Sequence, residues 1–184
     1  KVENIRQGEY FSLMTFSVVG MMIIASAADL IVVYLGLELM ALCIYCLVGL
    51  LKSDSRSNEA SIKYFLMGSF SSAILLFGIS LLYGLTGTTD LAGIALYCSQ
   101  GEILTNPALL VAFILVVSGF FFKIGAAPFH FWSPDVYQGA PTSVTAFMSV
   151  APKAAGFAII GRFLLMAFPD SQGQWGPLLV VIAL

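Results

Sequence analysis

Long apolar stretches separated by short polar ones dominate the hydropathy pattern of this chain. An α-helix needs about 20 consecutive apolar residues to cross the hydrocarbon core of a bilayer, so the pattern predicts an all-α, polytopic transmembrane helix bundle. The predicted spans lie near residues 10–28, 30–51, 60–85, 107–131 and 143–168, and another begins at 175–184. Because the chain opens without Met and stops inside an apolar run, we expect 1–184 to be a single transmembrane domain that is a fragment of a longer protein.

The fourth predicted span is interrupted. Gly125 and Pro128 follow Lys123 directly, and Pro128 leaves the carbonyl group of Ile124 without a helical partner, so we expect a break or kink there. Ser133, Pro134 and Asp135 then have the pattern of a helix start, which predicts a short helix closed by Gly139 and Pro141. Broken backbone at membrane depth is tolerated only where it lines a cavity or is buried in protein.

The distribution of Lys and Arg around the spans predicts an orientation. Four cations fall on one side, in the segment before the first span and in the polar connector 52–59, and they are Lys1, Arg6, Lys52 and Arg56. The segments expected on the other side contain neither Lys nor Arg, and they are 27–29, a longer loop over 86–106 and 169–174. By the positive-inside rule, the side with the four cations should be cytoplasmic.

Composition excludes several classes of protein. Hydrophobic residues make up 59% of the chain and charged residues only 10%, whereas soluble domains have roughly 25% charged residues. The net charge of −2 and the lack of a basic stripe argue against nucleic acid as a partner. Cys43 and Cys46 have the spacing of a redox motif, but they lie in an apolar helix and are expected to be structural. The sequence shows no metal-ligand cluster, nucleophile triad or phosphate loop.

Three ionisable residues lie within the apolar runs, and they are Glu38, Lys123 and Lys153. A charged side chain at membrane depth indicates a functional site, because its burial is costly without a partner or water. Simpler explanations remain open: Glu38 could be neutralised in a helix contact, and Lys123 could extend its side chain to the cytoplasmic interface. Lys153 follows Pro152 well inside its span and is the hardest of the three to explain by packing.

Two further residues are candidates with strong structural alternatives. Lys63 lies one turn after Glu59 at the start of the third span, so an interfacial ion pair would also explain it. His130 is the single histidine of the chain and lies among aromatic residues, where a packing role and a proton-relay role are equally reasonable. Asp135 is expected to cap a helix rather than to carry protons.

Three stretches around these residues resemble a known family. They are LGLEL at 35–39, NEASIKYF at 58–65 and FKIGAAPFHFWSPDVYQGAPT at 122–142. The chain is similar along its whole length to the antiporter-like membrane subunits of bacterial NADH-quinone oxidoreductase (respiratory complex I), to subunit N in particular, whose relatives include the Mrp sodium–proton antiporters. The resemblance implies about the fourth to the start of the ninth span of a fourteen-span, inverted-repeat protein.

The resemblance also implies roles for individual residues. Glu38 matches the family's fifth-span glutamate, Lys63 its sixth-span lysine, Lys123 the lysine before the broken seventh span and Lys153 its eighth-span lysine. His130 matches the histidine of the broken segment. The resemblance implies a multi-pass protein of the bacterial inner membrane, with other membrane subunits of the complex as partners. It implies NADH, FMN, iron–sulfur clusters and quinone for the whole complex and no redox centre in this chain.

The main hypothesis is a proton-translocating subunit that works electrostatically through Glu38, Lys63, Lys123, His130 and Lys153. At about 4 Å and an effective dielectric constant near 20, a Glu38–Lys123 pair would interact by roughly 4 kcal/mol. One alternative is an Mrp-type cation–proton antiporter subunit, which sodium dependence of transport would identify. Another is a structural role, in which the buried charges serve assembly.

Overall fold

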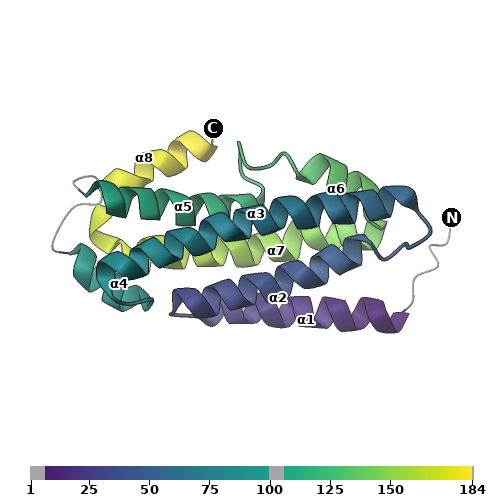
Figure 1. The fold of residues 1–184 in the computed structure, drawn as a ribbon, viewed down its shortest axis with the longest axis horizontal. Coiled ribbons are helices and arrows are strands. Elements are labelled where there is room, and N and C mark those ends of the chain that lie inside the picture. The colour runs from purple at the N-terminus through teal and green to yellow at the C-terminus, as the bar shows by residue number, and fades with distance from the viewer. Residues whose placement is uncertain (1–6, 100–105, 184) are drawn as a thin grey trace.

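The computed structural model describes residues 7–99 and 106–183, so Lys1 and Arg6 lie outside the described part of the chain. The described residues form an all-α bundle, as the hydropathy pattern predicts (Figure 1). Within them, five helical segments are long and apolar enough to cross a membrane. These are α1 (Gln7–Ser26), α2 (Leu30–Val48), α3 (Ser55–Thr86), α5 (Pro107–Ile124) and Thr142–Ala167, the last of which joins α7 (Thr142–Arg162) to a π-helical turn (Phe163–Ala167).

Two segments contain more helix than the sequence predicts. The third helix begins at Ser55, inside the segment predicted as a polar connector, because Asp54 caps it by accepting a hydrogen bond from the Arg56 amide. The segment 86–106 was predicted as a long loop, and this prediction is wrong where α4 (Leu91–Cys98) forms. Asp90 caps α4 by accepting from the Gly93 amide.

The two ends of the bundle carry different elements (Figure 1). The start of α1, the α2–α3 connector and the short helix α6 (Ser133–Gly139) lie at one end. At the other end, the α1–α2 turn meets the segment before α4, because the Leu30 amide donates to the Thr89 carbonyl group and the Leu91 amide to the Ala28 carbonyl group. A 3₁₀ turn (Pro169–Ser171) leads there into α8 (Gln172–Ala183).

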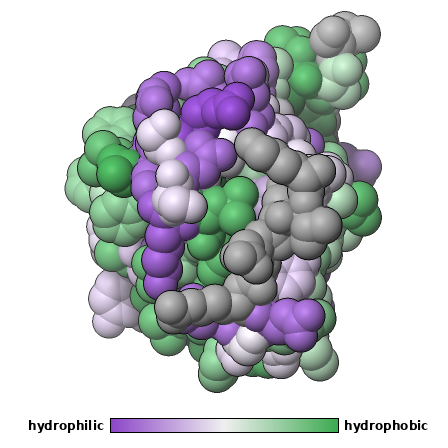
Figure 2. Space-filling view, turned by 90° about the vertical axis from the view of Figure 1, so that its right-hand side faces the viewer, coloured by the Kyte–Doolittle hydropathy of each residue, from purple (hydrophilic) through white to green (hydrophobic). Residues whose placement is uncertain are grey.

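The end that carries α6 is polar. Figure 2 looks onto this end and shows hydrophilic residues gathered over it, with hydrophobic residues along its margins. Its exposed polar residues include Lys52, Ser53, Arg56, Glu59, Lys63, Asp135 and Gln138. This arrangement suits a bundle whose flanks face an apolar medium and whose end reaches water.

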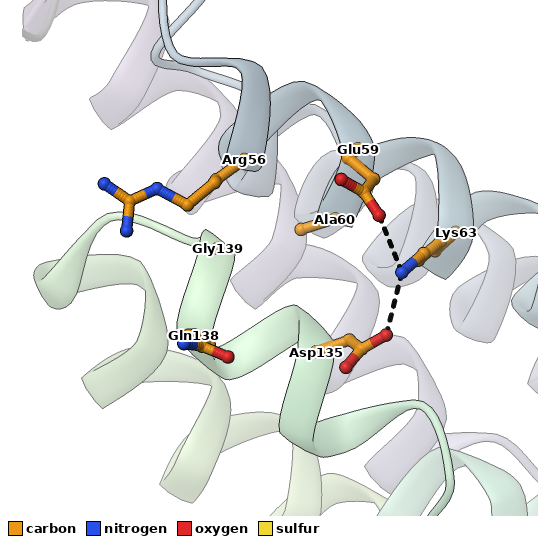
Figure 3. Close-up of a pocket in the computed structure, with 7 residues that line it drawn as sticks. All are labelled: Arg56, Glu59, Ala60, Lys63, Asp135, Gln138 and Gly139. Atoms are coloured by element: carbon orange, nitrogen blue, oxygen red, sulfur yellow. Dashed lines mark hydrogen bonds and ion pairs between the residues drawn. The ribbon is translucent and has the colours of Figure 1, made fainter.

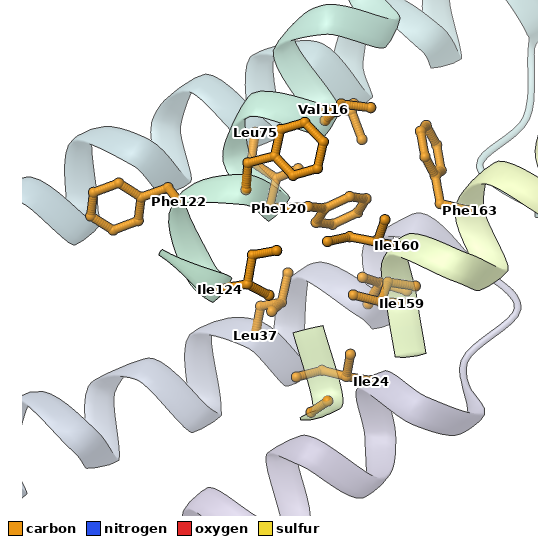
Figure 4. Close-up of a cluster of buried hydrophobic side chains, with 14 of the residues drawn as sticks. Ile24, Leu37, Leu75, Val116, Phe120, Phe122, Ile124, Ile159, Ile160 and Phe163 are labelled. Carbon is orange, nitrogen blue, oxygen red and sulfur yellow. The ribbon is translucent and has the colours of Figure 1, made fainter. Parts of the chain in front are cut away.

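The core lies where α1, α2, α3, α5 and α7 converge (Figure 4). Its fully buried side chains include Ile24, Leu37, Leu75, Phe120, Ile159 and Phe163. Because lipid tails are as apolar as leucine, close van der Waals packing rather than exclusion of water holds such helices together. Small residues permit that packing: a Cβ atom on Gly119 of α5 would lie 2.7 Å from the Leu75 Cβ atom of α3.

Candidate functional site: a buried ion pair beside a helix break

Glu38 lies in the middle of α2. That helix starts at Leu30 because the Asp29 carboxylate accepts hydrogen bonds from the Ile31 and Val32 amides. The Glu38 side chain is 24% exposed, so it is partly open while its neighbours Leu37 and Met40 are buried. The helix thus presents one carboxylate toward the interior of an apolar bundle.

Lys123 occupies the last turn of α5, and its side chain is only 4% exposed. The helix ends because Gly125 adopts a left-handed conformation with φ of 70°, in which its amide donates to the Phe122 carbonyl group. A lysine in the last turn of a helix is stabilised by the negative end of the helix dipole. The predicted break is therefore present, and it leaves Lys123 inside the bundle rather than at an interface.

Glu38 and Lys123 form an ion pair, with 3.6 Å between the Glu38 Oε1 and Lys123 Nζ atoms. A third side chain joins them: Ser72 of α3 donates a hydrogen bond to Glu38 Oε1, and Lys123 Nζ donates one to Ser72 Oγ over 3.1 Å. Three helices therefore supply one polar cluster at membrane depth. Sequence reasoning missed Ser72, because a serine in a helix rich in small residues gives no signal of a charged partner.

The break is anchored by Trp132. Its indole Nε1 donates over 3.0 Å to the Phe122 carbonyl group, which also accepts from the Gly125 amide at the end of α5. Its ring stacks on Tyr64 of α3 with 4.6 Å between the ring centroids. The segment between α5 and α6 is thus fixed against α3, close in sequence to Lys123.

Lys63 is exposed at the polar end and contacts two carboxylates (Figure 3). Its Nζ atom lies 2.8 Å from Glu59 Oε1 and 2.9 Å from Asp135 Oδ2. The pair with Glu59 is the interfacial pair considered from the sequence, while the pair with Asp135 joins α3 to α6 across a long sequence separation. Gly139 permits this approach, since a Cβ atom there would lie 2.5 Å from the Ala60 Cβ atom.

His130 and Lys153 lie apart from the Glu38–Lys123 pair. His130 is exposed in the turn before α6, and its carbonyl group accepts from the Ser133 amide and hydroxyl. Lys153 is half-buried in α7, with its Nζ atom 5.8 Å from the centre of the Tyr137 ring. Among the described residues, no hydrogen bond or ion pair connects either side chain to Lys123.

Some local expectations need correction. The short helix closes at Gly139 as predicted, but its N-cap residue is Trp132, and the Ser133 hydroxyl bonds back to His130 rather than capping. Asp135 pairs with Lys63 instead of acting only as a cap. Pro152 leaves α7 continuous from Thr142 to Arg162.

The described part of the chain does not bring together the donor side chains of a metal centre. Cys43 is buried and Cys46 is exposed, and both are free thiols. Residues 7–99 and 106–183 contain no group of three or more His, Cys, Asp and Glu side chains that could hold a metal ion. They therefore offer no donor set that fits an iron–sulfur cluster.

Comparison with known proteins places this geometry in a family. The family model described as NADH:quinone oxidoreductase/Mrp antiporter, TM, matches residues 27–184. NADH-quinone oxidoreductase subunit N of Desulfovibrio desulfuricans is 57% identical over 184 residues, which cover 98% of this chain and 36% of that relative.

Two solved structures have the same arrangement. A chain of respiratory complex I from Thermus thermophilus with bound aureothin is 38% identical with a TM-score of 0.75, and the match covers 86% of this chain and 35% of that one. A chain of the Mrp complex from Dietzia sp. is 25% identical with a TM-score of 0.81, and the match covers 94% of this chain and 32% of that one. The chain is thus similar to multi-pass membrane proteins and spans about a third of their length.

Proposed function

Since the chain belongs to the family of NADH:quinone oxidoreductase and Mrp antiporter transmembrane subunits, we propose that it is part of a proton-translocating subunit N of bacterial respiratory complex I. It lies in the inner membrane beside the other membrane subunits and couples quinone reduction elsewhere in the complex to proton pumping. The buried Lys123 ammonium beside the Glu38 carboxylate, at the end of an interrupted helix, carries this proposal.

The mechanism is electrostatic. Lys123 holds a proton while Glu38 lies beside it, and it releases that proton when the carboxylate is neutralised or moves away, because an unpaired ammonium group in a buried site is costly. His130 and Lys153 take part in accepting the proton on the far side of the break. Lys153 is half-buried, and its Nζ atom lies over the Tyr137 ring, 5.8 Å from the ring centre.

Protons arrive from the polar end of the bundle. A cavity of about 160 Å³ lies there between α3 and α6, and it is lined by Lys63 with Arg56, Glu59, Asp135 and Gln138 (Figure 3). It has room for several water molecules at about 30 Å³ each. Lys63 precedes Ser72 by roughly 14 Å along α3 at 1.5 Å per residue, so it supplies the first step toward the buried pair.

The polar end faces the cytoplasm, on the evidence of Lys52 and Arg56 there. A Ser55→Cys variant in a background without native cysteines should therefore react with an impermeant maleimide in inverted vesicles and not in right-side-out ones. The opposite pattern would reverse the proposed orientation.

Electron transfer belongs to other subunits of the complex. NADH, FMN, the iron–sulfur clusters and quinone have their sites there, and the described residues contain no group of three or more His, Cys, Asp and Glu side chains that would fit an iron–sulfur cluster. A second candidate function is that of an Mrp-type cation–proton antiporter subunit, which the structural likeness to the Mrp complex supports. Sequence identity favours the first, at 57% against 25%.

The test is Lys123→Met in the intact complex, with the exposed Lys52→Met as the matched control. We expect Lys123→Met to slow NADH-driven proton uptake into inverted vesicles strongly, while NADH oxidation by an artificial acceptor continues. Lys153→Met should also impair uptake, and Lys52→Met should not. Normal pumping by assembled Lys123→Met complexes would contradict the proposal, and transport that requires sodium would favour the antiporter.

A further inference from the structure

We propose that Ser72 is a positioning residue that holds Glu38 and Lys123 as a hydroxyl-bridged pair rather than as a direct contact pair. This inference rests on the proposed function for its consequence in transport, but its structural part can be tested separately. It assigns a role to a side chain that the sequence pattern alone does not single out.

The distances within the cluster support a bridge through the Ser72 hydroxyl group. The Lys123 Nζ and Glu38 Oε1 atoms are 3.6 Å apart, which is longer than a normal charge-assisted hydrogen bond of about 2.8 Å. Each of these two groups instead has a hydrogen bond to the same Ser72 oxygen. The Ser72 hydroxyl group accepts a hydrogen bond from the Lys123 ammonium group and donates its single proton to the Glu38 carboxylate. It therefore makes a hydrogen bond to each charged group at the same time.

The direction of the Ser72 hydroxyl group also supports a bridge. Serines inside helices commonly bond back to a carbonyl group of their own helix, and Ser26, Ser80 and Ser149 do so here. Ser72 is 3% exposed and donates across to α2 instead. Its neighbour Ser71 is 5% exposed, and its oxygen has no hydrogen-bond partner among the described residues.

The packing of α5 against α3 holds Ser72 in place. The close contact of Gly119 with Leu75 fixes the crossing of α5 over α3, about one turn before Lys123 and one turn after Ser72. This crossing sets Ser72 against Lys123 independently of Glu38, which comes from α2. The serine and the lysine therefore form a rigid half-site, and the carboxylate is the part that can leave or lose its charge.

The hydroxyl bridge has a consequence for transport. A contact pair would bind the ammonium group more tightly and would open less readily, because the attraction rises as the distance falls. With Ser72 between them, the two charges stay near enough to interact and far enough apart to separate within each turnover. Loss of the hydroxyl should therefore slow proton release without removing either charge.

The experiment compares variants of the intact complex. We expect Ser72→Ala to slow NADH-driven proton uptake and coupled quinone reduction about tenfold, a factor that corresponds to about 1.4 kcal/mol. Ser72→Thr, which keeps the hydroxyl, should retain most activity, whereas Ser72→Cys, similar in size but a weak donor, should behave like alanine. Ser71→Ala is the matched control and should leave uptake unchanged. NADH oxidation by an artificial acceptor reports assembly in every case.

Two readouts separate a bridge from simple packing. In a Glu38→Gln background, Ser72→Ala should cost much less than tenfold, because its partner carboxylate is already absent. The infrared carboxylate band that Glu38→Gln removes should also shift in Ser72→Ala and not in Ser71→Ala. An unshifted band, equal losses in the two alanine variants, or a full tenfold loss in the Glu38→Gln background would overturn the bridge. A shifted band in a chain whose Lys123→Met variant pumps normally would retain the bridge and reject the proposed function.

Discussion

The Glu38–Lys123 pair makes the most direct quantitative prediction. In the Glu38→Gln variant the carboxylate becomes a neutral amide of nearly the same shape. The lysine then keeps its hydrogen bond to Ser72 but loses the opposite charge 3.6 Å away. Lys123→Met removes the ammonium group and keeps most of the volume of the side chain. The double variant lacks both charges.

The magnitude follows from the distance between the two charges. At 3.6 Å and an effective dielectric constant near 20, the attraction is roughly 4 to 5 kcal/mol. The Gln amide oxygen can still accept from Ser72, and the Glu38 side chain is 24% exposed, so part of that energy is recovered. We expect a net loss of about 2 kcal/mol, which is about 30-fold in rate.

The assay is quinone reduction coupled to proton uptake in inverted vesicles, normalised to NADH oxidation by an artificial acceptor. Glu38→Gln should be about 30-fold slower than wild type, and Lys123→Met slower still. The double variant should match Lys123→Met alone, because Glu38 acts through the lysine that is already absent. As a control, Glu38→Gln combined with Lys52→Met should have the rate of Glu38→Gln alone. A further 30-fold loss on adding Glu38→Gln to Lys123→Met would refute the coupling.

Other contacts lead to further predictions. Asp135→Asn should weaken the α3–α6 contact and slow proton uptake, whereas Asp135→Glu, which keeps a carboxylate facing Lys63, should retain much of the rate. Equal defects in the two variants would contradict this. Gly119→Val should destabilise the assembled subunit by about 1 to 3 kcal/mol through overpacking and lower its melting temperature, whereas an unchanged melting temperature would mean that the crossing can relax. Burial raises the pKa of Asp29, but hydrogen bonds from the Thr89 side chain and two amides outweigh it and hold the pKa below its usual value of 3.8. Because the folded-state pKa of Asp29 is depressed, its contribution to stability is present above pH 3.8 and is lost as the pH falls through the folded-state pKa. Thr89→Val should move this acid-induced loss of helix content, followed by circular dichroism, to higher pH. An unmoved midpoint would exclude the contact between Thr89 and Asp29.

The class of fold and the helix break follow from the amino-acid sequence alone. Apolar runs of about 20 residues can be satisfied in a membrane only by helices, and the Gly125 to Pro128 segment cannot continue one. The unusual residues at membrane depth, Glu38, Lys123 and Lys153, were visible for the same reason, because charges stand out against an apolar background. The short helix after the break followed from the placement of Pro134 and Gly139, although the expected Ser133 cap does not form.

Which of these groups meet depends on how the helices pack against one another. Ser72 lies far in sequence from Glu38 and Lys123, and its contact with them depends on how α3 crosses both α2 and α5. The same is true of Asp135, whose local pattern suggested a cap and whose partner Lys63 comes from another helix. Helix α4 was missed because its eight residues lie between turn-forming ones and its start depends on Asp90. Local pattern specifies elements one at a time, whereas pairing depends on the crossing of whole helices, which small residues such as Gly119 set through packing.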